Sequence, residues 1–246
     1  MNKKRLLSET LLNDNSLAGA LYNRGTEDEV TCALPVFREC CYKCLRPVSS
    51  CHCRQIIPLS TRTRFVILMH PKEYKYQKLG TGRLTHLALS GSSLLSGVDF
   101  TDDPTLNALL RNKRYSPHLL YPGTAALNIS AGELPQVPSD RQLLVIIIDG
   151  TWACSRKVLH LSANLHDLPR LVINPGSPSR FTFKRQPKPH YIATIEAAYL
   201  LLSALADSGL ENPDPRRKLL LDLLDALVSF QEHCRHIRRD SSYRHN

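Results

Sequence analysis

Four cysteines within thirteen residues form the densest group of metal-binding side chains in the sequence. They follow the pattern Cys41-x2-Cys44-x6-Cys51-x-Cys53. Two closely spaced thiolate pairs across one turn are typical of a tetrahedral zinc site, and four protein sulfurs leave the metal no open position for water. The pattern therefore predicts a structural Zn²⁺ site. Buried free thiols, a disulfide, or exchange of Cys40 for one of the four are the alternatives.

A second chemical motif is "IIIDGTW", in which a strongly apolar run ends at Asp149, Gly150, Thr151 and Trp152. Desolvation at a strand end raises the pKa of a carboxyl group, so this carboxylate could accept a proton, and the indole offers a surface for stacking. The alternative is structural: Asp149 caps the following helix and Trp152 packs in the core.

Apolar runs alternate with helical patterns along the chain. The runs that predict strands are residues 64–70, 118–123, 143–152 and 171–175, and helices are expected near 82–90, 104–112, 152–163, 189–209 and 213–239. This alternation predicts an α/β fold with a mostly parallel sheet and helices on both faces. Ligands of such sheets bind beyond the carboxyl ends of the strands, where we expect His70, Tyr121 and Asp149.

The chain is basic, with 32 Lys and Arg against 22 Asp and Glu, a net charge of +10. Such an excess favours a polyanionic partner, nucleic acid before an anionic membrane, because neutralising phosphates releases counterions. No apolar run approaches the about 20 residues that cross a bilayer, and no export signal is visible. We expect a cytoplasmic protein, not embedded in a membrane, and a monomer.

Several short motifs occur together between about residues 38 and 205. They are "CYKCLRPVSSCHC" at 41–53, "MHPKE" at 69–73, "TGRL" at 81–84, "LYPG" at 120–123, "DGTW" at 149–152 and "TIEA" at 194–197, downstream of Arg180. In this order they resemble the DTW-domain family, tRNA-uridine aminocarboxypropyltransferases of a SPOUT-related fold. The resemblance implies a SPOUT-like core, which can be knotted, with a small N-terminal zinc knuckle and a C-terminal helix.

The domain organisation that we expect combines this resemblance with the charge pattern. Residues 1–37 form an N-terminal leader, 38–60 the zinc knuckle, 61–210 the catalytic DTW domain, and 211–246 a basic C-terminal helix and tail.

The resemblance also implies a reaction. S-adenosylmethionine is the donor substrate, and its 3-amino-3-carboxypropyl group passes to the ring nitrogen of a uridine in tRNA. That nitrogen is a weak acid and must lose its proton before it attacks, so Asp149 is the candidate base. The alternative is that Asp149 holds the amino group of the donor and that catalysis is mainly positioning.

The remaining candidate residues are placed by motif and by charge. Those expected to bind the donor are Leu120, Tyr121, Pro122, Gly123, Asp149, Gly150, Thr151, Trp152, Thr194 and Glu196, the last two at a helix start that can hold a carboxylate. Those expected to bind RNA are His70, Arg83, Arg180, Arg185, Arg216 and Arg217. Plain turns, a favourable helix dipole and solvated charges are the structural alternatives.

Two other functions compete with this one. A SPOUT-type RNA methyltransferase would use the same donor and a similar sheet. A non-catalytic, zinc-containing RNA-binding protein would need "DGTW" only for packing.

Overall fold

Six strands form one sheet in the part of the chain that the computed structural model describes, residues 39–76, 80–182 and 191–240. Their order is β2-β1-β5-β3-β6-β4, and each neighbouring pair is parallel. The strands are β1 Arg64–Met69, β2 Ser93–Ser96, β3 Tyr115–Leu120, β4 Leu127–Asn128, β5 Gln142–Asp149 and β6 Arg170–Val172. The predicted α/β fold is confirmed, and the described sheet is parallel throughout.

The two strands at the edges of the sheet, β2 and β4, are not expected from the sequence. β2 is four residues long and half-buried to exposed, and β4 has only two half-buried residues. Edge strands bury fewer side chains than central strands, so they need no long apolar run. The four predicted strands are the four inner ones.

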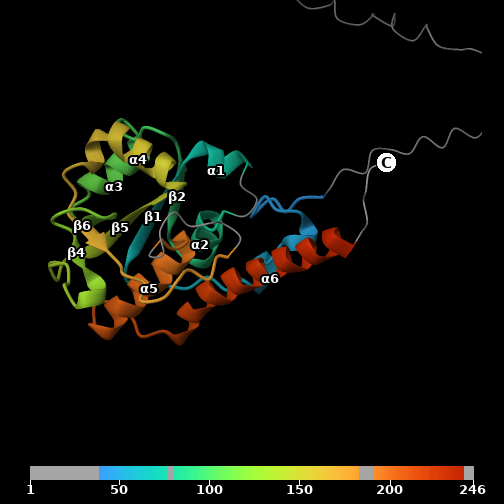
Figure 1. Cartoon of the computed structure of the whole chain (residues 1–246). Helices are drawn as coiled ribbons and strands as arrows, with labels where there is room; N and C mark the ends of the chain where they lie inside the picture. The colour runs from blue at the N-terminus through green and yellow to red at the C-terminus, as the bar shows by residue number, and fades with distance from the viewer. Residues whose placement is uncertain (1–38, 77–79, 183–190, 241–246) are drawn as a thin grey trace, which may run out of the picture. The chain divides into compact units, whose positions relative to one another are not determined.

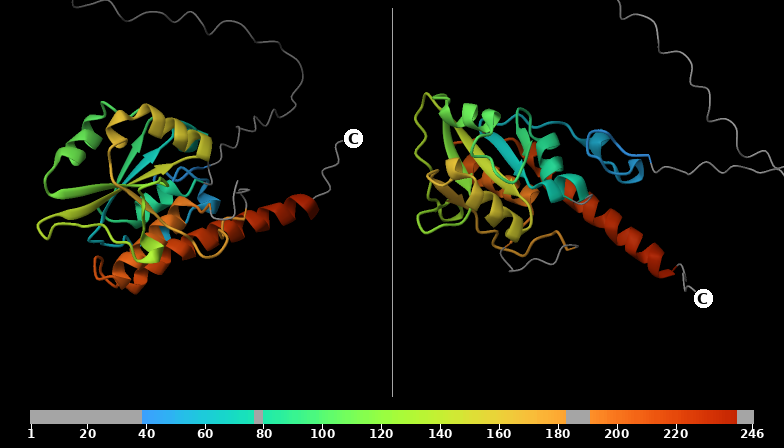
Figure 2. Two further views of the ribbon diagram at one scale, coloured as in Figure 1. Left: turned by 60° about the vertical axis from the view of Figure 1, so that its left-hand side comes forward. Right: turned by 90° about the horizontal axis from the view of Figure 1, so that it is seen from above.

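Helices cover both faces of the sheet (Figures 1 and 2). They are α1 Pro71–Tyr76, α2 Gly82–Ala88, α3 Pro104–Arg111, α4 Trp152–Leu161, α5 Thr194–Asp207 and α6 Leu219–Asp240, with a short 3-10 helix η5, Pro215–Lys218, before α6. One core cluster joins the sheet to α2, α5 and α6, and another joins it to α3 and α4. The prediction of helices on both faces is therefore confirmed.

The sequence of the central strand β5 is apolar without alternation because both faces of this strand are covered. Val145 and Ile147 pack in the cluster on the α5 side, whereas Leu144 and Ile146 pack in the cluster on the α4 side. A strand covered on both faces buries every side chain, and all of β5 after Gln142 is buried.

All described residues belong to one unit, residues 38–246. The predicted leader, residues 1–37, lies outside the described residues. The division of this unit at residues 60 and 210 stays a prediction.

Candidate functional site: an aromatic cavity at the carboxyl edge of the sheet

The carboxyl ends of the strands bring together residues that are far apart in the sequence. Asp149 ends β5, opposite Met69 of the neighbouring β1, and the backbone N–H of His70 donates to the Asp149 carbonyl over 3.0 Å. Tyr121 follows β3 on the other side of β5, and its N–H donates to the Leu171 carbonyl over 3.0 Å. His70, Asp149 and Tyr121 therefore lie at one edge, as the sequence predicts.

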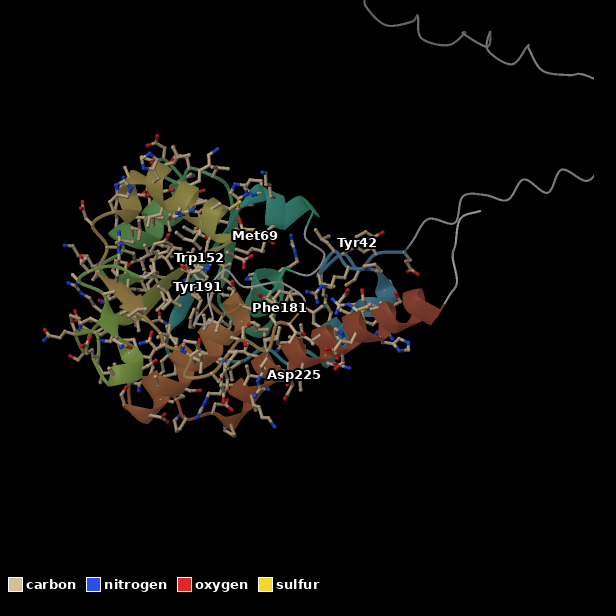
Figure 3. The ribbon with its side chains drawn as sticks, in the orientation of Figure 1. Tyr42, Met69, Trp152, Phe181, Tyr191 and Asp225 are labelled. Carbon is tan, nitrogen blue, oxygen red and sulfur yellow. The ribbon has the colours of Figure 1, made fainter. Side chains whose placement is uncertain are left out.

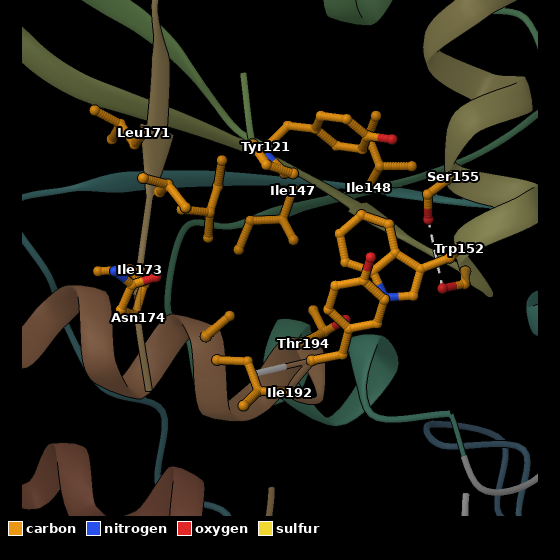
Figure 4. A pocket seen from close by; sticks show the side chains of 16 residues that line it. Tyr121, Ile147, Ile148, Trp152, Ser155, Leu171, Ile173, Asn174, Ile192 and Thr194 are labelled. Carbon is orange, nitrogen blue, oxygen red and sulfur yellow. Dashed lines mark hydrogen bonds between the residues drawn. The ribbon is translucent and has the colours of Figure 1, made fainter. Parts of the chain in front are cut away.

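A cavity of about 370 Å³ opens at this edge (Figure 4). Six of the expected donor-binding residues line it: Leu120, Tyr121, Pro122, Gly150, Trp152 and Thr194. Four others do not: Gly123, Asp149, Thr151 and Glu196. The volume lies within the range of pockets that bind small molecules, about 300–1,000 Å³.

Three aromatic rings form one wall of the cavity (Figures 3 and 4). The rings of Trp152 and Tyr191 are stacked, with centroids 4.0 Å apart and planes inclined at 26°. The Tyr121 ring is tilted against Trp152 at a centroid distance of 5.9 Å. Such a wall can stack on a planar heterocycle and attract a cation through the ring faces. Tyr191 is not among the predicted residues, because it lies just before α5 without a recognisable motif.

The rest of the lining is mostly aliphatic, with a few polar groups. Ile147, Ile173 and Ile192 are among the apolar residues, while Ser155 and Asn174 bring a hydroxyl and an amide to the lining. The Ser155 hydroxyl donates to the Gly150 carbonyl over 3.4 Å. Burial raises the pKa of the Tyr121 phenol, so this group stays neutral at pH 7. The cavity therefore combines a large apolar surface with a few hydrogen-bonding groups.

Asp149 does not line the cavity, but it is hydrogen-bonded to Thr194, which does. Asp149 is buried, and its Oδ1 accepts a hydrogen bond from the Thr194 hydroxyl over 2.5 Å. On another side it faces the backbone of Gly82, where an added Cβ would come within 2.5 Å of the carboxyl carbon. Two helix starts, those of α2 and α5, thus converge on this one carboxylate. Its connection to the cavity runs through the hydroxyl of Thr194, which does line it.

The turn after Asp149 is built by its own residues. The Thr151 hydroxyl caps α4 by accepting a hydrogen bond from the Cys154 N–H over 3.3 Å. Asp149 therefore is not the cap that the structural alternative required. The space at Gly150 is tight, because a Cβ there would lie 3.2 Å from the Cβ of Cys154.

Glu196 fixes the start of α5 by hydrogen bonds. Its carboxylate accepts hydrogen bonds from the Ala193 N–H over 2.8 Å, the Arg180 N–H over 2.8 Å and the Ser179 hydroxyl over 2.6 Å. These contacts connect the segment after β6 to the helix start that carries Thr194. The structure gives Glu196 a positioning role at the edge of the cavity.

Arg170 is a further residue at the cavity rim that sequence reasoning missed. Its Nη1 donates to the Pro122 carbonyl over 3.2 Å, and its guanidinium lies 5.9 Å from the centre of the Tyr121 ring. A Cβ on Gly123 would come within 2.9 Å of this side chain. Gly123 thus makes room for Arg170. The only signal in the sequence is a basic residue at the start of a predicted strand.

The expected RNA-binding residues do not form one group. His70 is buried, its Nδ1 accepts from the Lys72 N–H over 3.1 Å, and burial lowers its pKa, with the charges of Lys72 and Lys157 adding to the effect. On α2, the Arg83 guanidinium lies 4.3 Å from the centre of the Tyr74 ring. Both residues lie near the carboxyl edge of the sheet.

The other expected RNA-binding residues lie elsewhere. Arg180 forms an ion pair of 2.9 Å with Asp225 on α6. Arg216 pairs with Asp214, and Arg217 bonds to Ser203 near the end of α5, which starts at the cavity and is about 20 Å long. Arg185 lies outside the described residues.

The four predicted cysteines form one cluster in the knuckle. Their sulfur atoms all lie within 4.8 Å of one another, with 3.9 Å between Cys41 and Cys53 and 3.7 Å between Cys44 and Cys51. Four sulfurs at about 2.3 Å from a tetrahedral Zn²⁺ lie about 3.8 Å apart, so the donor set fits this ion. Cys40 is exposed and lies outside the cluster.

The cysteines of the knuckle differ in their electrostatic surroundings. Backbone hydrogen bonds, mainly from Cys44, lower the pKa of the Cys41 thiol to about 6, whereas burial raises the pKa of Cys44 and Cys53. Four thiolates this close repel one another unless a metal neutralises them. Arg46, which is 3% exposed, adds a positive charge beside them, and burial is the main cause that lowers its own pKa.

None of the helices among the described residues is both long and apolar enough to cross a membrane.

Fold and site together define an α/β protein with a cavity at the carboxyl edge of a parallel sheet and a separate cluster of four cysteines that could hold a metal ion. Residues 38–232 match the model of the DTW domain, and the chain belongs to this family.

Three similar proteins carry the name tRNA-uridine aminocarboxypropyltransferase 2. The protein of Macaca fascicularis is 30% identical over 78% of this chain and 63% of its own length, and that of Mus musculus is 29% identical over 82% and 67%. The protein of Drosophila melanogaster is 26% identical over 80% of this chain and 76% of its own length. The chain thus spans less than two thirds of the macaque relative. No solved structure matches the chain, so the SPOUT relationship and a knot stay predictions.

Proposed function

We propose that the chain is a tRNA-uridine aminocarboxypropyltransferase that uses S-adenosylmethionine as donor. Its family and the names of its relatives support this reaction. The observation that carries the proposal is the aromatic cavity next to the Asp149–Thr194 pair.

The cavity suits the parts of this donor. Trp152 and Tyr191 offer a stacked surface for the adenine ring, and the faces of aromatic rings attract a positively charged sulfonium. Thr194 opens α5, and the unsatisfied N–H groups of a helix start favour a carboxylate such as that of the donor. Leu120, Pro122 and Gly150 complete the lining.

The reaction needs one proton acceptor and one leaving group. The uridine ring nitrogen loses its proton and attacks the carbon next to the sulfonium. The new N–C bond forms as the C–S bond breaks, and the electron pair of that bond neutralises the sulfur, so that methylthioadenosine leaves. We propose that the Thr194 hydroxyl accepts the proton while passing its own to Asp149, because the carboxylate reaches the cavity through this hydroxyl.

The knuckle has a structural part in this proposal. Zn²⁺ bound by Cys41, Cys44, Cys51 and Cys53 would be closed to substrates, because all four positions are occupied by protein sulfurs. The ion fixes the fold of the segment that carries Arg46. We further propose tRNA as the partner, the cytoplasm as the compartment and a monomer as the active form.

The test incubates the purified chain with unmodified tRNA and S-adenosylmethionine labelled in its carboxyl group. We expect label in the RNA, and we expect Asp149→Asn and Thr194→Val each to reduce the rate by about 10²–10⁴-fold, the usual share of a general base. Thr194→Ser keeps the hydroxyl and should stay near the wild-type rate. Asp102→Asn removes an equal charge from an exposed site and serves as the matched control.

Two results would contradict the proposal. Transfer from methyl-labelled donor in place of carboxyl-labelled donor would identify a methyltransferase. No transfer of either label, under conditions in which tRNA binds and the donor does not raise the melting temperature, would point to a non-catalytic RNA-binding protein.

A further inference from the structure

Basic residues gather at the amino edge of the sheet, opposite the cavity. The segments that begin β1, β3 and β5, and the segment between α5 and α6, all lie at this edge. Together residues 61–64, 111–115, 138–142 and 207–218 contain nine Lys and Arg but four Asp and Glu. These basic residues are Arg62, Arg64, Arg111, Lys113, Arg114, Arg141, Arg216, Arg217 and Lys218. We name them the amino-edge cluster.

Hydrogen bonds hold three members of this cluster next to one another. Gln142 donates through its backbone N–H to the Arg114 carbonyl over 2.8 Å and through its side-chain amide to the Arg62 carbonyl over 2.6 Å. Arg141 precedes Gln142 directly. Because β1, β5 and β3 are neighbours in the sheet, each of the three strands brings one arginine to the same place.

The end of α5 completes the cluster. The Arg62 guanidinium donates to the Gly209 carbonyl over 3.4 Å, and the Glu211 carboxylate accepts from the Arg62 and Thr63 N–H groups, each over 2.7 Å. Arg217 in η5 donates to the Ser203 hydroxyl over 3.2 Å.

Most of the positive charge of this cluster is not neutralised. Arg62, Arg64 and Arg217 bond to carbonyl or hydroxyl oxygens, and Arg64 also lies 5.7 Å from the centre of the Tyr115 ring. Arg216 alone in the cluster forms an ion pair among the described residues, with Asp214. The Glu211 carboxylate is occupied by backbone N–H groups. A face whose charges merely served solubility would gain from interspersed acids, which are scarce here.

A cavity of about 250 Å³ opens within this edge. Arg62, Arg141 and Ser139 line it, together with Thr63. Thr63 is 2% exposed, and its hydroxyl has no hydrogen-bond partner among the described residues. Two arginines line this hollow, and a guanidinium group can donate paired hydrogen bonds to the oxygen atoms of a phosphate.

We propose that the amino-edge cluster is a second RNA-contact surface, and that the hollow between Arg62 and Arg141 receives a backbone phosphate. This inference deepens the proposed function and rests on it for the identity of the RNA as tRNA. The eight residues of β5 separate the two edges by about 25 Å. An RNA that contacts both edges must extend over at least that distance, which excludes a single nucleotide and suits a large molecule such as tRNA.

The experiment measures the affinity of the full chain for unmodified tRNA over a series of KCl concentrations. The test variant combines Arg62→Gln, Arg114→Gln and Arg141→Gln. The control variant combines Lys43→Gln, Arg54→Gln and Arg235→Gln, which remove the same charge from other exposed positions. Melting temperatures, and the affinity for S-adenosylmethionine, show whether both variants keep the fold and the donor site.

We expect the test variant to bind tRNA at least about tenfold more weakly at 0.1 M KCl and to lose about one unit of the salt slope for each phosphate contact removed. Its affinity for S-adenosylmethionine should not change. Replacing the same three arginines by lysine should restore much of the binding. Equal losses in test and control variants, or wild-type binding by the test variant, would overturn the inference.

This outcome is distinct from failure of the proposed function. If tRNA binding depends on the amino edge but no label is transferred, the RNA-contact surface is supported and the proposed transferase activity is contradicted. If the test variant transfers label with the wild-type KM for tRNA, the proposed transferase activity is supported and the RNA-contact surface is contradicted.

Discussion

At the residue scale, Asp149 takes its position from two neighbours on different helices. Thr194 at the start of α5 donates to its Oδ1, and Gly82 at the start of α2 leaves space that no other residue type would leave. The carboxylate is confined on both sides, so its distance from the cavity is fixed by packing. In the proposed reaction, a group held in this way would lose little by reorganisation.

Gly82→Ala tests this confinement. The new Cβ would lie 2.5 Å from the carboxyl carbon of Asp149, so either the carboxylate or α2 must move. We expect a loss of about 1–3 kcal/mol in the free energy of unfolding, as for other overpacked sites, and a lower transfer rate. Denaturant unfolding and the label-transfer assay measure the two effects.

A double-mutant cycle supplies the control for this prediction. In an Asp149→Ala background the clash is relieved, so Gly82→Ala should cost much less stability there than in the wild-type chain. Equal costs in both backgrounds would mean that the carboxylate does not limit the space at Gly82.

At the element scale, the knuckle is connected to the start of α2. Cys44 belongs to the main core cluster, and Arg46 donates from its Nη2 to the Gly80 carbonyl over 3.1 Å, two residues before Gly82. A metal that fixes the knuckle therefore also supports the helix start that faces Asp149. Metal binding and folding are coupled in such closed thiolate sites.

Cys44→Ser should remove the support that the knuckle gives to the start of α2. We expect the variant to lose its zinc and to melt at least about 5 °C lower, since roughly 2–4 °C correspond to each kcal/mol in a chain of this size. Zinc content and a thermal melt measure both effects. Cys40→Ser is the matched control, because Cys40 is exposed and outside the cluster, and it should keep one zinc per chain. Zinc loss in the Cys40→Ser variant would show that the ligand set is different.

At the scale of the whole molecule, the two edges of the parallel sheet carry different kinds of side chains. The carboxyl edge holds the aromatic cavity, and the amino edge holds the amino-edge cluster. Helix α5 runs from the carboxyl edge at Thr194 to the amino edge near Gly209. The first half of α6 packs against α5 (Figure 1). The buried leucines of α6 are Leu220, Leu221, Leu223, Leu224 and Leu227.

Truncation of α6 tests whether its buried leucines, all in its first half, are what the fold needs from this helix. A chain that ends after Gln231 keeps all five buried leucines, so we expect a melting temperature within about 3 °C of the full chain. A chain that ends after Lys218 loses them, and burial of each is worth about 1.5–3 kcal/mol, so we expect it not to fold. Circular dichroism melts measure both truncations. A folded chain without α6 would show that these leucines are dispensable for the core.

The inner part of the sheet and two aspects of the sites could be predicted from the sequence. Continuous apolar runs indicate β1 and β5, which are buried on both faces, and cysteine spacing is local enough to indicate the metal cluster. The meeting of parallel strand ends at one edge predicts the position of Tyr121, and the family motifs indicate Leu120 and Gly150; all three line the cavity. The edge strands β2 and β4 could not be predicted, since they bury too little surface to leave an apolar signal.

The sequence by itself determined the inner strands, most of the helices, the grouping of the four cysteines and which side chains stand at the strand ends, because these depend on spacing within short segments. The tertiary structure alone decided that Tyr191 stacks on Trp152, that Asp149 reaches the cavity through Thr194, and that Arg62, Arg114 and Arg141 meet at the opposite edge. Each of these contacts joins residues from separate segments. Their distance in space follows from the order of the strands and the packing of the helices, which no local pattern encodes.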